Sequence, residues 1–166
     1  MQNDYRLSAC WLQVKLPVFD IEKVKKIREA TSLSVGEISK ALSEAGGDES
    51  RALQILKDRG VQIADKKSSR EIKEGIVECY IHGNRKIGAM VELGSETDFV
   101  AKNEEFKKLA HELAMQVASM DPKDPEDLIS QTFIKDPSMT IADLVNQYIA
   151  RLGENIKIRK IIRFEI

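Results

Sequence analysis

The segment Thr97, Asp98, Phe99 and Val100 places a carboxylate beside a large aromatic side chain. It follows a strand-like run over residues 87–93 and leads into an amphipathic helix. An exposed Phe leaves about 2 kcal/mol of burial energy ungained, and a ring that enters a partner's pocket recovers that energy. The pattern therefore indicates a docking wedge. The alternative, Phe99 as an ordinary core residue at a helix start, stays open.

Catalytic and metal chemistry have little support in this sequence. Its two cysteines, Cys10 and Cys79, are too few for a disulfide framework or a zinc site, and its two histidines, His82 and His111, share no ligand spacing with them. No Ser/His/Asp, Cys/His or Gly-rich phosphate motif is present. We therefore expect no catalytic residues, no metal site and no cofactor.

The near-zero net charge and the few aromatic residues argue against nucleic acid as a partner. The chain has 166 residues, a net charge of −1 and 5% aromatic residues. Nonspecific nucleic-acid binding needs a basic footprint, and single-strand binders stack bases on aromatic side chains. We therefore do not expect nucleic acid as the main partner. A weaker alternative is RNA or ribosome binding through a basic C-terminal cluster: Lys157, Arg159, Lys160 and Arg163.

The N-terminal extension, residues 1–19, receives no functional assignment. Residues 7–10 resemble a lipoprotein cleavage box, but no apolar run precedes them, so the signal-peptide pattern fails. No run in the chain approaches the roughly 18 apolar residues of a membrane span. We therefore expect no membrane partner.

Residues 20–60 are predicted to form three short helices with apolar stripes at helical spacing. The expected caps and stops are Asp20, Ser34 with Glu37 as a capping box, Gly46 and Gly47, Asp48, and Gly60. Three helices in so short a stretch resemble a ubiquitin-associated-type module, which offers a surface for docking a partner. A bundle of this size is marginal by itself, so we expect it to lean on a neighbour.

Residues 61–74 are polar and of mixed charge, which predicts a linker, either helical or extended. Phosphate binding by the basic residues within 66–70 is the minor alternative. Residues 75–93 then predict a β-hairpin with turn residues from His82 to Arg85. On the return strand the alternating apolar residues are Ile87, Ala89, Val91 and Leu93. The helix after the Phe99 segment carries a core stripe: Phe106, Leu109, Ala110, Leu113, Val117 and Met120.

The C-terminal part completes an α+β core domain over residues 75–166. Residues 121–138 leave room for a loop or one short helix, and Thr140 with Asp143 has capping-box spacing for a last helix that Gly153 ends. The final strand is predicted to place one apolar face on the core: Ile156, Ile158, Ile162, Phe164 and Ile166. The opposite face is charged, with Ile161 as an apolar exception. The expected fold class is α+β: a three-helix bundle, a linker, then a small antiparallel sheet layered with helices.

Taken together, several segments resemble the elongation factor Ts family, the guanine-nucleotide exchange factors of elongation factor Tu. The matching segments are residues 26–31, 40–42, 74–77, 80–82, 91–103 and 149–156. The resemblance runs from about Val24 to Ile166. It implies a cytoplasmic protein of translation elongation whose partner is elongation factor Tu, both GDP-bound and nucleotide-free.

The chain departs from the family pattern at three places. Residues 32–36 replace a Gly-Ala-Gly-Met-Met-type loop, so the docking contribution of Val35 and Gly36 does not carry over. Gly94 and Ser95 stand where the family has Asn-Cys, and residues 121–138 lack the family's extra helices. The chain therefore resembles a short form with a single core layer. Such a layer can pair with a second copy, so a homodimer through the core domain is a further expectation.

The resemblance also assigns contact residues. It implies that Phe99 inserts near the Mg²⁺ and phosphate site of the GTPase, with Asp98 beside it and Thr97 and Val100 fixing the turn. Arg28 on the helical module is expected to anchor the partner's surface away from that site. The remaining partner-binding candidates are Gly153, Glu154 and Asn155, for which a contact and a helix cap are equally good explanations.

The competing hypothesis is a non-catalytic module for protein binding and dimerisation, with Phe99 buried in its own core. The wedge mechanism requires no covalent chemistry. If the factor weakens nucleotide binding by some ratio, the nucleotide weakens factor binding by the same ratio. Incoming GTP can then expel the factor from its partner.

Overall fold

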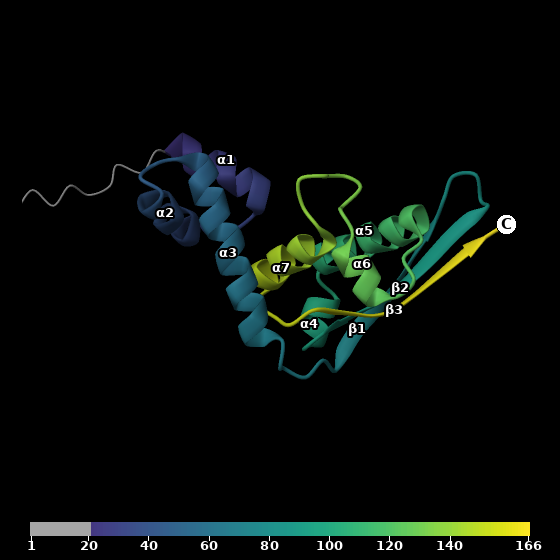
Figure 1. The fold of residues 1–166 in the computed structure, drawn as a ribbon. Helices are drawn as coiled ribbons and strands as arrows, with labels where there is room; N and C mark the ends of the chain where they lie inside the picture. Colours follow the sequence, from purple (N-terminus) through teal and green to yellow (C-terminus); the bar gives the residue numbers. More distant parts are fainter. Residues whose placement is uncertain (1–20) are drawn as a thin grey trace, which may run out of the picture.

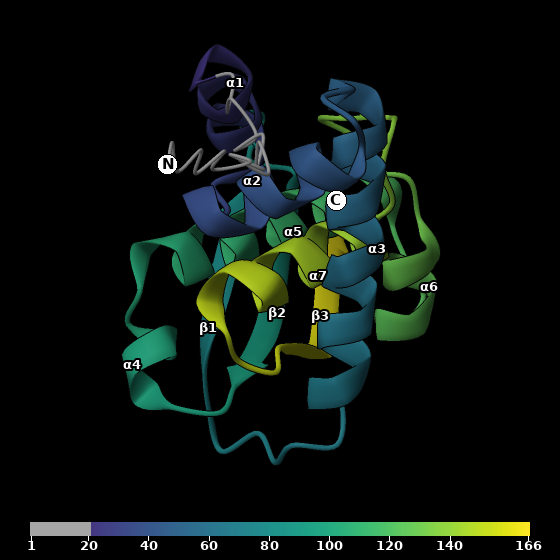
Figure 2. The same cartoon turned by 90° about the vertical axis from the view of Figure 1, so that its left-hand side faces the viewer.

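The computed structural model describes residues 21–166 and shows three helices followed by a sheet with helices on one face (Figure 1). The N-terminal extension and the expected cap Asp20 lie outside the described residues. The predicted α+β class is confirmed, with an antiparallel sheet of three strands in the order β1-β2-β3. A view turned by 90° shows α3 and α7 side by side in front of the sheet (Figure 2).

The helical part consists of α1 (Ile21–Thr31), α2 (Val35–Glu44) and α3 (Glu49–Lys67). The predicted capping box is confirmed, because the Ser34 hydroxyl accepts from the Glu37 backbone N–H at 3.2 Å and the Glu37 carboxylate accepts from the Ser34 N–H at 3.3 Å. The three helices enclose a small core of their own: Val24, Ile27, Ile38, Ala41, Leu42, Ala45, Ala52 and Leu56.

Helix α3 is longer than the sequence indicated, and the predicted end at Gly60 is wrong. The helix continues for two further turns to Lys67. Gly60 is buried in the helix, where an added Cβ would lie 3.8 Å from the backbone oxygen of Asn146 on α7. A glycine in a helix interior costs about 1 kcal/mol relative to alanine, and the packing of α3 along α7 carries the helix past this residue. Ala64 then joins the core of the α+β part, so α3 crosses the predicted boundary between the module and the linker.

The sheet consists of β1 (Glu74–Ile81), β2 (Ile87–Ser95) and β3 (Lys157–Glu165). Helices α5 (Glu104–Met120), α6 (Pro125–Ser130) and α7 (Ile141–Leu152) cover one face, and the one-turn helix α4 (Asp98–Ala101) follows the end of β2 (Figure 1). The main core lies between sheet and helices. Its fully buried members are Val91, Leu93, Phe106, Leu109, Ala110, Leu113, Ala114, Val117, Leu128 and Ile141.

The face prediction for the last strand is wrong beyond Arg159. Glu92 pairs with Lys160, whereas the next residue of β2 pairs with Ile158, so Arg159 is an extra residue in the ladder. Such a bulge reverses the faces of every later residue. Ile158 is buried as predicted, but Ile161 packs on the core instead of Ile162.

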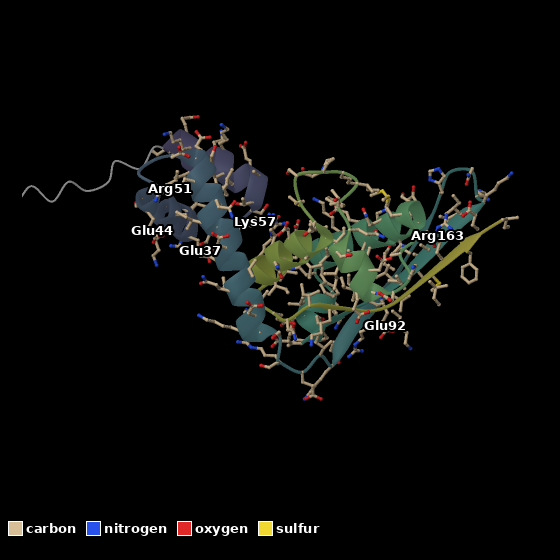
Figure 3. All side chains as sticks on the ribbon, in the orientation of Figure 1. Glu37, Glu44, Arg51, Lys57, Glu92 and Arg163 are labelled. Atoms are coloured by element: carbon tan, nitrogen blue, oxygen red, sulfur yellow. The ribbon has the colours of Figure 1, made fainter. Side chains whose placement is uncertain are left out.

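The reversal leaves an apolar surface on the uncovered side of the sheet. We call this surface the outer sheet face. It consists of exposed residues that are neighbours in the strand register: Val77, Cys79, Ile81, Met90, Ile162 and Phe164. Arg163 turns instead toward the helices, where its Nε donates to the carbonyl of Ala118 at 3.0 Å (Figure 3).

Candidate protein-docking site

Phe99 is the most exposed large apolar side chain within a helix of the described residues, at 84% exposure. Its neighbours in α4, Val100 and Ala101, are buried in the main core. The alternative of Phe99 as a core residue is therefore wrong. The one-turn helix is anchored on one side and presents the ring to solvent on the other.

Asp98 lies beside the ring and is paired within its own helix. The Lys102 ammonium donates to the Asp98 carboxylate at 2.8 Å. This hydrogen bond holds the pKa of Asp98 below its ordinary value and raises the pKa of Lys102. The first turn of α4 therefore carries a carboxylate that is ionised at neutral pH, directly before the exposed ring.

The backbone before Phe99 is held by Glu154, which lies far away in the sequence. One oxygen of the Glu154 carboxylate accepts the N–H groups of Glu96 at 3.1 Å and Thr97 at 3.0 Å. Its other oxygen accepts the Thr97 hydroxyl at 2.6 Å. Thr97 is the N-cap of α4 but makes no side-chain cap bond. The Glu154 carboxylate accepts the backbone N–H of this N-cap residue and of the residue before it, so its negative charge lies at the helix start.

Glu96 and Asn155 complete the arrangement. Glu96 accepts the backbone N–H of Asn155 at 2.6 Å. The Asn155 side chain donates to the carbonyl of Arg70 at 2.9 Å and is 2% exposed. A direct contact of Asn155 with a partner was one of the two explanations that the sequence left open, and it does not fit this burial. Asn155 instead ties the Phe99 segment to the end of the connection that follows α3.

Gly153 is the C-cap of α7 with φ +77°. This left-handed conformation suits glycine and supports the cap explanation that the sequence left open. Its carbonyl accepts a hydrogen bond from Lys67 Nζ at the end of α3. Of the three candidates in this segment, Glu154 and Asn155 are thus brought together with Thr97 and Phe99, and Gly153 ends the helix before them.

Arg28 is exposed on α1, at a groove of about 840 Å³ between α1 and α2. The groove is mostly apolar and carries three basic residues and one acidic residue at its rim. Its lining residues are Ile21, Val24, Lys25, Arg28, Val35, Gly36, Ser39, Lys40, Ser43 and Glu44. The structure therefore does not place Arg28 within the Phe99 segment; it places it on a second surface.

Sequence reasoning missed several residues at these surfaces. Val35 and Gly36, left unassigned because they depart from the family pattern, line the groove beside Arg28. Val35 is the first residue of α2, inside the Ser34–Glu37 capping box, and is 48% exposed. An apolar residue directly after a helix N-cap was a usable signal. The role of Glu96 had no comparable signal, because it depends on a contact with Asn155 across 59 positions.

Residues 21–166 contain neither a metal-binding cluster nor a membrane-spanning helix. Within that part of the chain no cluster of three or more His, Cys, Asp or Glu side chains could hold a metal ion. None of its helices combines the length and the apolar character required to cross a bilayer. His82 lies after β1 and contacts the Tyr80 hydroxyl at 3.2 Å, in line with the structural role expected for it.

Comparison with known proteins gives a consistent result. Residues 96–166 match the family model described as elongation factor TS. The chain is 38% identical to elongation factor Ts of Thermodesulfovibrio yellowstonii, with 87% of this chain and 94% of the relative covered. It is 36% identical to elongation factor Ts of Thermotoga petrophila, with 88% and 95% covered. The matched family region begins at Glu96 and so contains the Phe99 segment and its Glu154 and Asn155 partners.

Proposed function

Because the chain belongs to the elongation factor Ts family, and is therefore a translation elongation factor, we propose that it promotes release of GDP from elongation factor Tu. The observation that carries this proposal is the exposed Phe99 ring on a short helix whose other side is buried. An exposed aromatic side chain on an ordered element is the kind of anchor that fills a partner's pocket.

In the proposed complex the Phe99 ring enters the GTPase near its Mg²⁺ and phosphate site, with Asp98 beside it. Displacement of the switch region and the phosphate loop weakens Mg²⁺ coordination, and Mg²⁺ neutralises the charge of the diphosphate. GDP therefore leaves faster. Thr97 and Glu154 act by holding the turn, and Val100 by anchoring α4 in the core.

The helical module supplies the second contact. We propose that residues 20–60 dock the GTPase through Arg28 and the apolar α1–α2 groove, while residues 75–166 carry the wedge. Residues 61–74 then act as a partly helical joint, because α3 runs through the first half of that segment. The basic rim formed by Lys25, Arg28 and Lys40 favours an acidic surface on the partner.

The exchange requires no covalent step. The factor binds the GDP form and the nucleotide-free form of its partner, and the reciprocal effect of nucleotide on factor binding lets GTP release it. No cofactor enters this mechanism, and its place of action is the cytoplasm, where translation elongation occurs.

The test is stopped-flow release of a fluorescent GDP analogue from elongation factor Tu. Loss of an interface anchor of this size costs about 2 kcal/mol, so Phe99→Ala should lower the exchange rate about thirtyfold at limiting factor. The ring is 84% exposed, so the melting temperature should hardly change. Met120→Ala is the matched control, because Met120 is 50% exposed and lies at the end of α5 that is remote from Phe99. This variant should release GDP at the parental rate. Normal exchange by Phe99→Ala would instead favour a binding module without a wedge.

We also propose a homodimer through the outer sheet face. Met90 lies opposite Ile162 in the register of β2 and β3, and both are exposed at the centre of this apolar surface. A contiguous apolar patch of this kind is typical of an interface. Sedimentation velocity should give a dimer for the parent chain and a monomer for Ile162→Glu. A monomeric parent at micromolar concentration would contradict the dimer without affecting the exchange proposal.

A further inference from the structure

The two contact surfaces of the proposed function lie on separate elements, with Arg28 on α1 and Phe99 on α4. A single GTPase can meet both at once only when α1 keeps a set orientation relative to the α+β part. Helix α3 packs along α7 and carries the module, and Figure 3 shows Lys57 on the side of α3 that faces α7. Helix α1 lies farther from the sheet, so its orientation relative to the α+β part depends on a contact of its own with that part.

Arg151, in the last turn of α7, makes that contact. Its Nη2 donates to the carbonyl of Thr31, the last residue of α1, at 2.8 Å. Its Nη1 donates to the carboxylate of Glu105 at 2.5 Å, in the first turn of α5. The guanidinium carbon lies 4.8 Å from the ring centre of Tyr148. One side chain therefore joins the end of α1, the start of α5 and α7.

The chemistry of this position requires arginine. The carbonyl at the C-terminal end of α1 carries partial negative charge, and the planar guanidinium presents two separate N–H groups to two acceptors on different helices. The Arg151 side chain is only 16% exposed, and its Nε is buried without a hydrogen-bond partner. An unpaired buried donor is costly, which argues that the connection between helices is what this residue provides.

The same stretch of chain also holds the wedge. Glu154, three residues after Arg151, accepts the backbone N–H groups before Phe99. Glu105, the other partner of Arg151, lies in the first turn of α5, which begins shortly after α4 ends. The end of α7 is thus bonded to α1 on one side and to the Phe99 segment on the other.

We propose that Arg151 is a positioning residue that sets the orientation of α1, and with it Arg28, relative to Phe99. The proposal rests on the proposed exchange function in one respect: Arg28 and Phe99 are taken as the two contacts. Arg151 itself touches neither nucleotide nor Mg²⁺. Its removal leaves both contacts intact but no longer arranged for one partner, so the affinity suffers more than the maximal rate.

The first measurement is structural and needs no partner. Spin labels at Glu22 on α1 and Lys108 on α5, both exposed, report the distance distribution between the module and the core by pulsed electron resonance. The background carries Cys10→Ser and Cys79→Ser. Arg151→Met should broaden the distribution, and Arg151→Lys should give an intermediate width because one ammonium cannot reach both acceptors. The matched control is Lys57→Met, which breaks the 2.9 Å ion pair to Asp143 on the same helix α7.

The second measurement is GDP release as a function of factor concentration. Preorganised contacts gain affinity by lowering the cost of ordering, and the expected shift of the half-saturating concentration in Arg151→Met is about tenfold upward. The plateau rate should stay within about twofold of the parent, because Phe99 can still enter. Phe99→Ala should instead lower the plateau. A merely structural role lowers the active fraction of the factor and so raises the apparent half-saturating concentration as well. Factor concentrations are therefore expressed as folded protein, measured from the amplitude of the unfolding transition; a shift caused by misfolded protein then vanishes, whereas a shift caused by lost positioning remains.

The outcomes separate the two proposals. Broadening in Arg151→Met without broadening in Lys57→Met supports the positioning role, as does the shift in half-saturation. An unchanged distribution, equal broadening in both variants, or loss of the plateau at unchanged half-saturation overturns it. Should Arg151→Met fail to fold, Arg151→Lys decides by the same criteria. A parent chain that does not speed GDP release refutes the exchange function, while the distance measurement still decides the role of Arg151.

Discussion

Replacing Glu154 with alanine removes the acceptor of three hydrogen bonds that hold the backbone before Phe99. Two of these bonds come from backbone N–H groups to a charged oxygen, and such bonds contribute about 1.5 kcal/mol each at the low end. At this half-buried site water can bond some of the freed N–H groups and so restores part of the lost free energy. The segment before Phe99 is then destabilised by about 2 kcal/mol. Glu154→Gln keeps one acceptor oxygen without charge, so about half of that loss is expected.

The consequence for function follows from the size of α4. The helix has four residues, and one helical turn is not stable without outside support. A local loss of about 2 kcal/mol raises the opening equilibrium of the segment about thirtyfold. Phe99 is then presented for a smaller fraction of the time, and the exchange rate of Glu154→Ala should fall at limiting factor, by at most the same roughly thirtyfold.

Two assays check this reasoning. Amide hydrogen exchange should lose protection at Glu96 and Thr97 in Glu154→Ala, with Glu154→Gln intermediate, while the amides of the α5 core stay protected. Stopped-flow GDP release then reports the rate. Glu104→Ala is the matched control, because Glu104 lies in the first turn of α5 and forms an exposed ion pair to Lys107 at 2.8 Å. Parental protection and a parental rate in Glu154→Ala would refute the role assigned to its carboxylate.

Further predictions concern pH and stability. Burial, followed by the charge of Glu112, raises the pKa of Tyr148 from 10.0 to about 12. The unfolded chain therefore loses this proton first, so stability falls as the pH rises from about 10 to 12, and Tyr148→Phe should show a smaller fall in urea midpoint between pH 9 and pH 11. Lys102→Met should raise the pKa of Asp98 toward its ordinary value in an NMR titration, because its hydrogen-bond donor is lost. Phe106→Ala, at 0% exposure, should cost about 3–5 kcal/mol in denaturant unfolding, whereas Gly153→Ala, at φ +77°, should cost about 1 kcal/mol.

Much of the fold could be predicted because its signals are local. The Ser34–Glu37 and Thr140–Asp143 capping boxes act over three residues, and both are present as expected. The core stripe of α5 follows from helical spacing and is fully buried from Phe106 to Val117. Met120, the last member of that stripe, is half exposed because the helix ends there and the chain turns away at Asp121.

The errors occurred where a local rule met a distant partner. Gly60 has the sequence character of a helix end, but α3 packs along α7 at this point and continues to Lys67. The last strand alternates in sequence except at Lys160 and Ile161, and the extra residue Arg159 in its pairing with β2 exchanges the two faces there. The broken alternation was a local sign of this bulge, but a bulge is a property of two strands together, so the position of the extra residue came only from the pairing.

The sequence by itself determined the class of the fold and the family and singled out Phe99, because caps, periodicity and the motif around Phe99 depend on residues a few positions apart. That the Phe99 ring is exposed and not buried came from the tertiary structure. Only the tertiary structure decided that Glu154 holds the backbone before that ring, 57 positions away, and that Asn155 is internal. It also decided that Arg151 joins α7 to the end of α1, 120 positions away. Hydrogen bonds of this kind form only after the whole chain has brought their ends together, so they leave no periodic signal in the residues that make them.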